Sequence, residues 1–235
     1  MKAASAKVFR LIKLSLLGMI AIVLAWQLWL FGWVLWWNWV NPAETSFMEI
    51  RMDELHVKKP DAKMKHQWVP YAKISNNLKR AVIASEDAKF VDHEGFDWDG
   101  IQKAIEKNQK KGKVVAGGST ISQQLAKNLF LSPRKSMLRK VEEAAITIMI
   151  EGVWSKQRIL EVYLNSIEWG NGVFGAEAAA RHYYGISADR LGPEQAAKLA
   201  GMVPNPRLYD RNRSAPGLAR KTGVILSRMP EAEIP

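Results

Sequence analysis

The chain has 235 residues, of which 48% are apolar, contains no cysteine and carries a formal net charge of +11. The absence of cysteine excludes a disulfide framework and a thiolate metal site. The length suits one main domain with an appendage, and the charge predicts a polyanionic partner: nucleic acid, phospholipid head groups or a phosphorylated substrate.

A basic tail over residues 1–13 and a transmembrane helix over residues 14–40 are the first elements expected. The tail contains four basic residues and no acidic one, and residues 14–37 carry no charge. At about 1.5 Å per residue, this uncharged run is about 36 Å long, enough to cross a bilayer core with some tilt. It ends among tryptophans typical of a membrane–water interface, namely Trp33, Trp36, Trp37 and Trp39.

A cleaved signal peptide is the alternative interpretation of this run. Its apolar region would be about 7–15 residues long and would end in a small-residue cleavage site, whereas this run is longer and ends among tryptophans. Because the basic tail precedes the helix, the positive-inside rule places the N-terminus in the cytoplasm and the remainder of the chain outside. The sequence therefore predicts a single-pass membrane protein with an external domain.

Residues 41–69 are expected to form a membrane-proximal linker, and residues 70–235 the functional domain. Prolines at 42 and 60 interrupt the linker, and Pro70 follows it directly. After residue 78, apolar residues recur at helical spacing and strand-like alternation never exceeds four residues. The external domain is therefore predicted to be mainly α.

The stretch SEDAKFVDHEGFD, residues 85–97, contains the adjacent acids Glu86 and Asp87. A carboxylate among apolar neighbours gains a raised pKa and can act as a general base. An ordinary acidic helix end is the alternative. His93 fits a structural, hydrogen-bonded histidine, and the four histidines of the chain lack the spacing of a zinc site, so we expect no protein-ligated zinc.

The stretch GGSTISQQLAKN, residues 117–128, predicts a helix with an uncharged polar face. Thr120 and Gln123 match a capping box, so the helix begins after the two glycines. At 100° per residue, one arc of about 140° collects the polar side chains of Thr120, Gln123, Gln124, Lys127 and Asn128. A solvated face is the ordinary explanation. Glutamine and asparagine amides, however, donate and accept hydrogen bonds and suit sugar hydroxyls, and a helix N-terminus suits an anionic oxygen.

The stretch RKVEEAAITIMIEGVWSKQRILEVYLN, residues 139–165, predicts a central and largely apolar helical segment that is opened by Arg139 and Lys140 and interrupted near Gly152. Glu143 lies on the polar stripe of that helix. A carboxylate beside arginine and lysine is either a structural ion pair or part of a phosphate-binding site, and both alternatives stay open.

Four stretches in this order resemble the consecutive signature motifs of the peptidoglycan glycosyltransferases, namely EDAKFVDHEGFD, GGSTISQQLAKN, RKVEEA and KQRILEVYLN. Residues 168–185, EWGNGVFGAEAAARHYYG, are similar to the form found in monofunctional members. The family polymerises lipid II and includes the N-terminal halves of class A penicillin-binding proteins. The resemblance covers residues 70–206 and implies a mainly α, lysozyme-like glycosyltransferase fold with a head and a jaw that dips into the membrane.

The resemblance also implies a reaction. The C4 hydroxyl of the GlcNAc in one lipid II attacks C1 of the terminal MurNAc of the growing chain and displaces undecaprenyl diphosphate with inversion. Carried over by motif, Glu86 is the general base, and Glu143 is a second acid that organises the cations or the leaving group. The implied substrate-binding residues are Ser119, Thr120, Gln123, Gln124, Lys127, Asn128, Arg139 and Lys140, with Lys127, Arg139 and Lys140 at the diphosphate.

The implied partners are lipid II, the growing glycan chain and the membrane, with cell-wall synthesis proteins as further candidates and no nucleic acid. The implied location is the bacterial inner membrane, with the catalytic domain in the periplasm. No cofactor is obligatory and no metal site is predicted, although a divalent cation, Mg²⁺ or Mn²⁺, at the diphosphate stays open. The basic segment NQKKGKVVAGG, residues 108–118, is expected to be a mobile edge of the cleft.

Three other functions compete with this interpretation. A lysozyme-like enzyme that cleaves peptidoglycan is the nearest one. A penicillin-binding transpeptidase would use the short motifs SPRK, SNN and KTG, but here their order is wrong and too little chain follows the last one. A membrane-anchored basic scaffold would explain the charge but neither the polar helix face nor the patch around Glu86.

Overall fold

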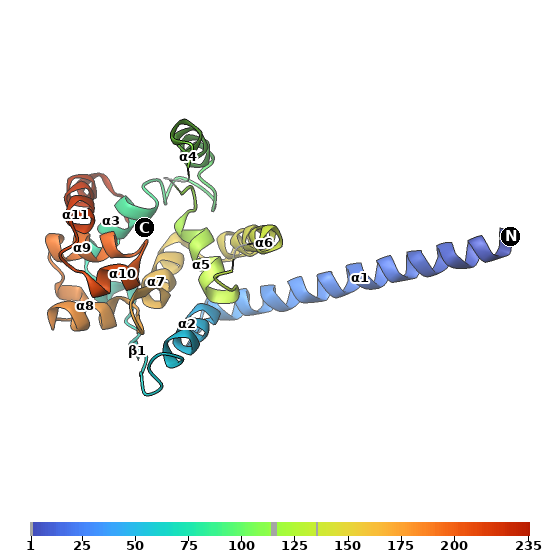
Figure 1. The fold of residues 1–235 in the computed structure, drawn as a ribbon, viewed down its shortest axis with the longest axis horizontal. Helices are drawn as coiled ribbons and strands as arrows, with labels where there is room; N and C mark the ends of the chain where they lie inside the picture. Colours follow the sequence, from blue (N-terminus) through green and yellow to red (C-terminus); the bar gives the residue numbers. More distant parts are fainter. Residues whose placement is uncertain (1, 114–116, 135) are drawn as a thin grey trace. The chain divides into compact units, whose positions relative to one another are not determined.

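The computed structural model describes residues 2–113, 117–134 and 136–235, and the chain divides into two compact units, Met1–Val40 and Asn41–Pro235. Helices dominate both units, so the predicted mainly α fold is confirmed (Figure 1). Part of the segment expected to edge the cleft, residues 114–116, lies outside the described residues. Its mobility therefore stays a prediction.

The first unit is the helix α1, Lys2–Trp37. Among the described residues, one stretch is long and apolar enough to cross a membrane, and it is Phe9–Trp37 of this helix, with a mean hydropathy of 2.1. Tryptophan rings pair along it at helical spacing: the centroids of Trp26 and Trp29 are 4.9 Å apart and those of Trp33 and Trp37 are 5.2 Å apart. The helix ends shortly before Pro42, where a proline disfavours helical backbone in the preceding residue.

The second unit is a set of helices around a small sheet. Its helices are α2 (Ser46–His56), α3 (Asn76–Glu86), α4 (Trp98–Lys111), α5 (Ile121–Phe130), α6 (Met137–Val153), α7 (Lys156–Ser166), α8 (Ala176–Tyr184), α9 (Pro193–Met202), α10 (Pro206–Arg211) and α11 (Pro216–Arg228). Short 3₁₀ turns span Tyr71–Lys73, Ala188–Arg190 and Met229–Glu231. The strands β1 (Lys65–His66), β2 (Glu168–Gly170) and β3 (Val173–Phe174) form a sheet in the order β1-β3-β2, in which β3 is parallel to β1 and antiparallel to β2.

The central helix of this unit is α5, which packs against α6, α7 and α2. The predicted capping box is confirmed: the side chain of Thr120 accepts from Gln123 N, and Gln123 Oε1 accepts from Thr120 N at 3.1 Å. Ile121, Leu125 and Leu129 are fully buried, as an apolar helix face requires. The polar side is enclosed as well, because Gln123 is only 4% exposed and Asn128 only 6%. The alternative of an ordinary solvated face is therefore wrong for α5.

The segment 41–69, expected as a linker, contains α2. Thr45 caps this helix by accepting from Met48 N at 3.2 Å. Met48 and Met52 pack with Phe174 of β3 in an apolar cluster, and α2 also lies against α5. This helix is thus an integral part of the second unit.

Candidate active site

The general base implied by the resemblance, Glu86, is the last residue of α3 and lies among groups that fix its carboxylate. Ser85 Oγ donates to Oε1 at 3.0 Å, and Gln124 Nε2 donates to Oε2 at 3.0 Å. Burial raises the pKa of Glu86, and the hydrogen bonds from Gln124 and Ser85 and the charges of Lys221 and Lys127 offset part of that rise. The carboxylate is thus oriented and made more basic than an exposed glutamate.

The amide of Gln124 is itself oriented by α7. The hydroxyl of Tyr163 donates to Gln124 Oε1 at 2.8 Å, so the amide nitrogen faces Glu86. Tyr163 is fully buried, and burial raises its pKa well above the ordinary value, so it remains a protonated donor. The chain of contacts from Tyr163 to Gln124 to Glu86 joins three helices at one point.

The neighbouring acid, Asp87, has a structural role in this arrangement. Its carboxylate accepts from His93 Nε2 at 2.9 Å and from the backbone N of Ile121 at 2.9 Å, which is the first residue of α5. His93 is thus a hydrogen-bonded structural histidine, as predicted. Gly95 allows this loop to approach α6, because its φ is +90° and a Cβ there would lie 2.8 Å from Thr147 Cγ2.

A cavity of about 350 Å³ opens beside Glu86. Its lining includes Ser85, Glu86, Asp97, Gly117, Gly118, Ser119, Thr120 and Arg228. Thr120 is already engaged in the cap, and its hydroxyl also donates to Gly95 O at 2.7 Å. The structure therefore brings Glu86, Ser119 and Thr120 of the implied site together around one space.

An ion cluster around one buried carboxylate of α6 lies next to this cavity. Glu143 is 3% exposed and accepts from Arg139 Nη1 at 2.8 Å and from Lys140 Nζ. Lys140 Nζ also lies 3.4 Å from Ser119 Oγ, which lines the cavity. Glu143 therefore forms the ion pairs of the structural alternative. The same ion pairs adjoin a cavity, as the phosphate-binding alternative requires.

A second cavity, of about 180 Å³, carries the remaining polar residues of α5. Its lining includes Gln124, Lys127 and Asn128, together with Phe47, Arg51, Tyr163 and Glu168. Burial lowers the pKa of Lys127; the charge of Glu143 opposes this, and Arg139, Lys140 and Arg51 lower it further. Because Gln124 lines this cavity and also binds Glu86, it connects the acidic and the cationic halves of the site.

Sequence reasoning missed the contributions of α2 and the role of Tyr163. Phe47 and Arg51 lie in the segment taken for a linker, although their i, i+4 spacing after a capping threonine is a recognisable helix signal. Tyr163 belongs to the motif KQRILEVYLN, but periodicity alone does not tell which buried tyrosine bonds which amide.

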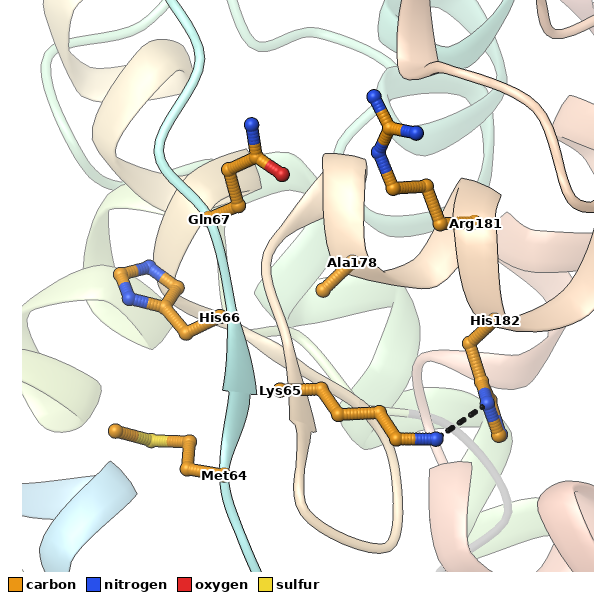
Figure 2. Close-up of a pocket in the computed structure, with 7 residues that line it drawn as sticks. All are labelled: Met64, Lys65, His66, Gln67, Ala178, Arg181 and His182. Atoms are coloured by element: carbon orange, nitrogen blue, oxygen red, sulfur yellow. Dashed lines mark hydrogen bonds between the residues drawn. The ribbon is translucent and has the colours of Figure 1, made fainter.

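A third cavity, of about 380 Å³, lies elsewhere on the second unit, where β1 adjoins α8 (Figure 2). Several of its polar groups already have partners: Lys65 Nζ lies 3.1 Å from His182 Nδ1, and Arg181 Nε donates to Glu177, outside the lining, at 2.7 Å. It contains none of the residues of the implied site. We therefore place the candidate active site at the two cavities around α5.

Two further features bear on function. Within residues 2–113, 117–134 and 136–235, no cluster of three or more histidine, aspartate or glutamate side chains could bind a metal ion.

The helix α6 presents exposed apolar side chains beside its ion cluster, namely Met137, Leu138, Val141 and Ile148, of which Leu138 is 84% exposed. Such a concentration of exposed apolar residues marks a surface that binds a partner or a membrane.

Comparison with known proteins decides the family. A model described as transglycosylase matches residues 53–230. The chain belongs to the transglycosylase family. It is 74% identical to the biosynthetic peptidoglycan transglycosylase of Dechloromonas aromatica (strain RCB), over 96% of this chain and 98% of that protein. It is 63% identical to the protein of the same name from Azoarcus sp. (strain BH72), over 94% and 95% of the two chains.

Family membership settles several of the expectations. The predicted family, the lysozyme-like fold class and the assignment as a peptidoglycan glycosyltransferase are confirmed. The peptidoglycan-cleaving alternative is not favoured. The family match begins at residue 53, within α2 and within the segment expected as a linker.

Proposed function

We propose that this protein joins lipid II units into glycan strands, with Glu86 as the base and the cations around Glu143 as the diphosphate site. The observation that carries the proposal is the position of Gln124, which binds Glu86 and also lines the cavity of Lys127. One side chain thus connects a basic carboxylate with a cationic space, which is the combination that transfer from a diphosphate donor requires.

In the proposed step, Glu86 accepts the proton of the C4 hydroxyl of the acceptor sugar. The hydroxyl oxygen forms a bond to C1 of the donor sugar, and the bond from C1 to the diphosphate oxygen breaks. The electron pair of that bond leaves with the diphosphate, so charge develops on the leaving oxygen. The raised pKa of Glu86 supports its role, because a more basic carboxylate accepts the proton more readily.

The developing charge on the diphosphate is met by Lys127, Arg139 and Lys140. Glu143 is the acid that binds two of them, so the four groups together retain positive charge for the substrate. Fixed cations in a partly buried site stabilise a leaving diphosphate more than mobile ions in water would. Glu143 in this proposal positions Arg139 and Lys140 and does not transfer a proton.

The remaining residues of the implied site fall into three groups. Asn128 and Gln124 present amides to the second cavity and are proposed to bind sugar or phosphate oxygens. Ser119 and Thr120 line the first cavity. Gln123 is engaged in the capping box, so we propose that it acts by fixing the N-terminus of α5.

We propose that the diphosphate subsite works without a divalent cation held by the protein. The side chains around the proposed diphosphate site are mostly cationic, and the one buried carboxylate there, Glu143, already binds Arg139 and Lys140. These side chains do not form an all-protein oxygen site for Mg²⁺ or Mn²⁺, whereas an ion carried by the oxygens of the diphosphate itself stays an open alternative. We propose that Lys127, Arg139 and Lys140 supply the charge that such an ion would otherwise supply.

The membrane is proposed to be both tether and source of substrate. The apolar length of α1 supports an anchor in the bacterial inner membrane, and the basic residues before it support a cytoplasmic N-terminus with the second unit in the periplasm. The exposed apolar residues of α6 support lipid contact close to the proposed diphosphate site. Lipid II, the growing glycan and cell-wall synthesis proteins are the proposed partners.

The proposal is tested by incubating the purified full-length chain with labelled lipid II and separating the products by length. Glycan strands should lengthen with time, and EDTA should leave most of the activity. Shortening of preformed glycan, with lipid II unconsumed, would support a cleaving enzyme and contradict the proposal.

A further inference from the structure

The helix α2 brings a cation to the cavity of Lys127 from outside the signature motifs. Phe47 and Arg51 lie four residues apart, so they share one face of α2, and both line this cavity with Lys127. The guanidinium carbon of Arg51 lies 4.6 Å from the ring centroid of Phe47, and Lys127 Nζ lies 5.7 Å from the same centroid. One aromatic ring thus contacts both cations, within the distance at which a ring face attracts a positive charge.

Arg51 lines the cavity of Lys127, and its ion pairs use Nη1 and Nε, so Nη2 takes part in neither of them. Its Nη1 bonds Glu54 at 2.8 Å, whereas its Nε is buried 3.5 Å from Glu168 Oε2 and has no hydrogen-bond partner among the described residues. Both carboxylates are also bound by Arg207, at 2.8 Å and 2.7 Å. Two arginines therefore share two glutamates. The two negative charges balance the two positive ones, so there is no excess of negative charge at Arg51.

The charges near Lys127 show where an anion would be stabilised. Arg139, Lys140 and Arg51 all disfavour the protonated form of Lys127, and Glu143 is the group that favours it. Lys127, Arg139, Lys140 and Arg51 thus place four positive charges in one region. Glu143 offsets part of this charge, and so does Glu168, which also pairs with Arg207. A ligand with two or more negative charges relieves this repulsion, whereas a neutral sugar does not.

We propose that Arg51 is a fourth cation of the diphosphate subsite and that Phe47 positions Arg51 and Lys127 for it. This inference rests on the proposed function, because it assigns a further residue to the same subsite. A guanidinium presents a planar fork that matches phosphate oxygens, which the single amine of Lys127 cannot do. The helix α2, which follows the anchor in the sequence, then forms part of the substrate site.

The test measures inhibition of polymerisation by the product, undecaprenyl diphosphate, with the full-length chain in detergent micelles. Arg51→Met should weaken this inhibition by about tenfold or more, because a charge-assisted hydrogen bond is lost. Arg51→Lys should recover part of it, since the charge remains and the fork does not. Thermal melting of each variant shows whether the fold is intact.

The matched control is Glu54→Gln, which removes one of the two ion-pair partners of Arg51 and keeps the arginine. If Arg51 binds the diphosphate, Glu54→Gln should leave inhibition unchanged or make it stronger. If Arg51 only supports the fold, Glu54→Gln and Arg51→Met should weaken inhibition equally, and that result overturns the inference.

Lys127→Met separates this inference from the proposed function. Weaker inhibition in Lys127→Met together with unchanged inhibition in Arg51→Met would reject Arg51 and leave the subsite in place. Unchanged inhibition in both variants would reject the subsite itself.

Discussion

Replacing Glu86 by glutamine isolates the proton-accepting role of this residue from its role in packing. The new amide can keep both neighbours, with its oxygen accepting from Gln124 Nε2 and its NH₂ group donating to Ser85 Oγ, at the positions now 3.0 Å from each carboxylate oxygen. The shape of the site is therefore preserved and the basic oxygen pair is lost. A general base contributes about 10²–10⁴-fold to rate, so turnover should fall by at least about 100-fold.

Stability should change in the opposite direction to activity. Burial raises the pKa of Glu86 above its ordinary value of 4.5, so the folded chain binds this proton more tightly than the unfolded chain. The ionised carboxylate therefore costs stability, and the cost is complete above the raised pKa and absent well below 4.5. Glu86→Gln should melt at a higher temperature than the wild type at pH 8, with the difference shrinking as the pH falls toward 4.

The assay is the rate of lipid II polymerisation across pH, with product chain length and melting temperature measured on the same samples. The wild-type rate should rise with pH as Glu86 ionises, and this acidic limb should be absent from the residual rate of Glu86→Gln. Glu94→Gln is the matched control, because Glu94 is an exposed glutamate of the same motif, and it should behave as the wild type. Near-normal turnover in Glu86→Gln would refute the assignment of the base.

Four other outcomes are expected. Glu143→Gln should lower the free energy of unfolding by about 1–3 kcal/mol and weaken product binding, because Arg139 and Lys140 lose their shared anion; urea unfolding and product inhibition measure this, and unchanged values would contradict it. Tyr163→Phe should slow turnover and cost about 1–3 kcal/mol, since a buried amide oxygen loses its donor, whereas Tyr184→Phe should not slow turnover. Deleting residues 1–40 should leave a folded second unit that polymerises poorly and sediments less with vesicles; loss of the melting transition would argue against a separate unit. In that truncated protein, Leu138→Gln should reduce the remaining vesicle binding about tenfold at an unchanged melting temperature, and unaltered binding would exclude lipid contact by α6.

Local patterns predicted those parts of the fold that depend on neighbours in the sequence. The uncharged run of α1 and the capping box of α5 follow from spacing over a few residues, and both are present in the structure. The grouping of polar residues on one side of α5 also followed from helical geometry. Spacing could not tell what covers that side, and Gln123 and Asn128 are buried because other parts of the domain enclose them.

The parts that escaped prediction depend on long-range contacts. Tyr163 and Gln124 are 39 residues apart, and their hydrogen bond follows from the packing of α5 against α7. Arg51 lines the cavity of Lys127 only because α2 packs against α5, and the two prolines of the segment 41–69 favoured a linker. No local pattern carries the information that two distant helices share a cavity.

The central claim is that the formation of each glycosidic bond releases one molecule of undecaprenyl diphosphate. The direct measurement is the molar ratio of undecaprenyl diphosphate released to glycosidic bonds formed, with purified full-length protein and doubly labelled lipid II. The account predicts a ratio of about one, with longer glycan at every time point and both products formed at least about 100-fold more slowly by Glu86→Gln. Glycosidic bonds that disappear from preformed glycan without release of the lipid diphosphate would contradict it.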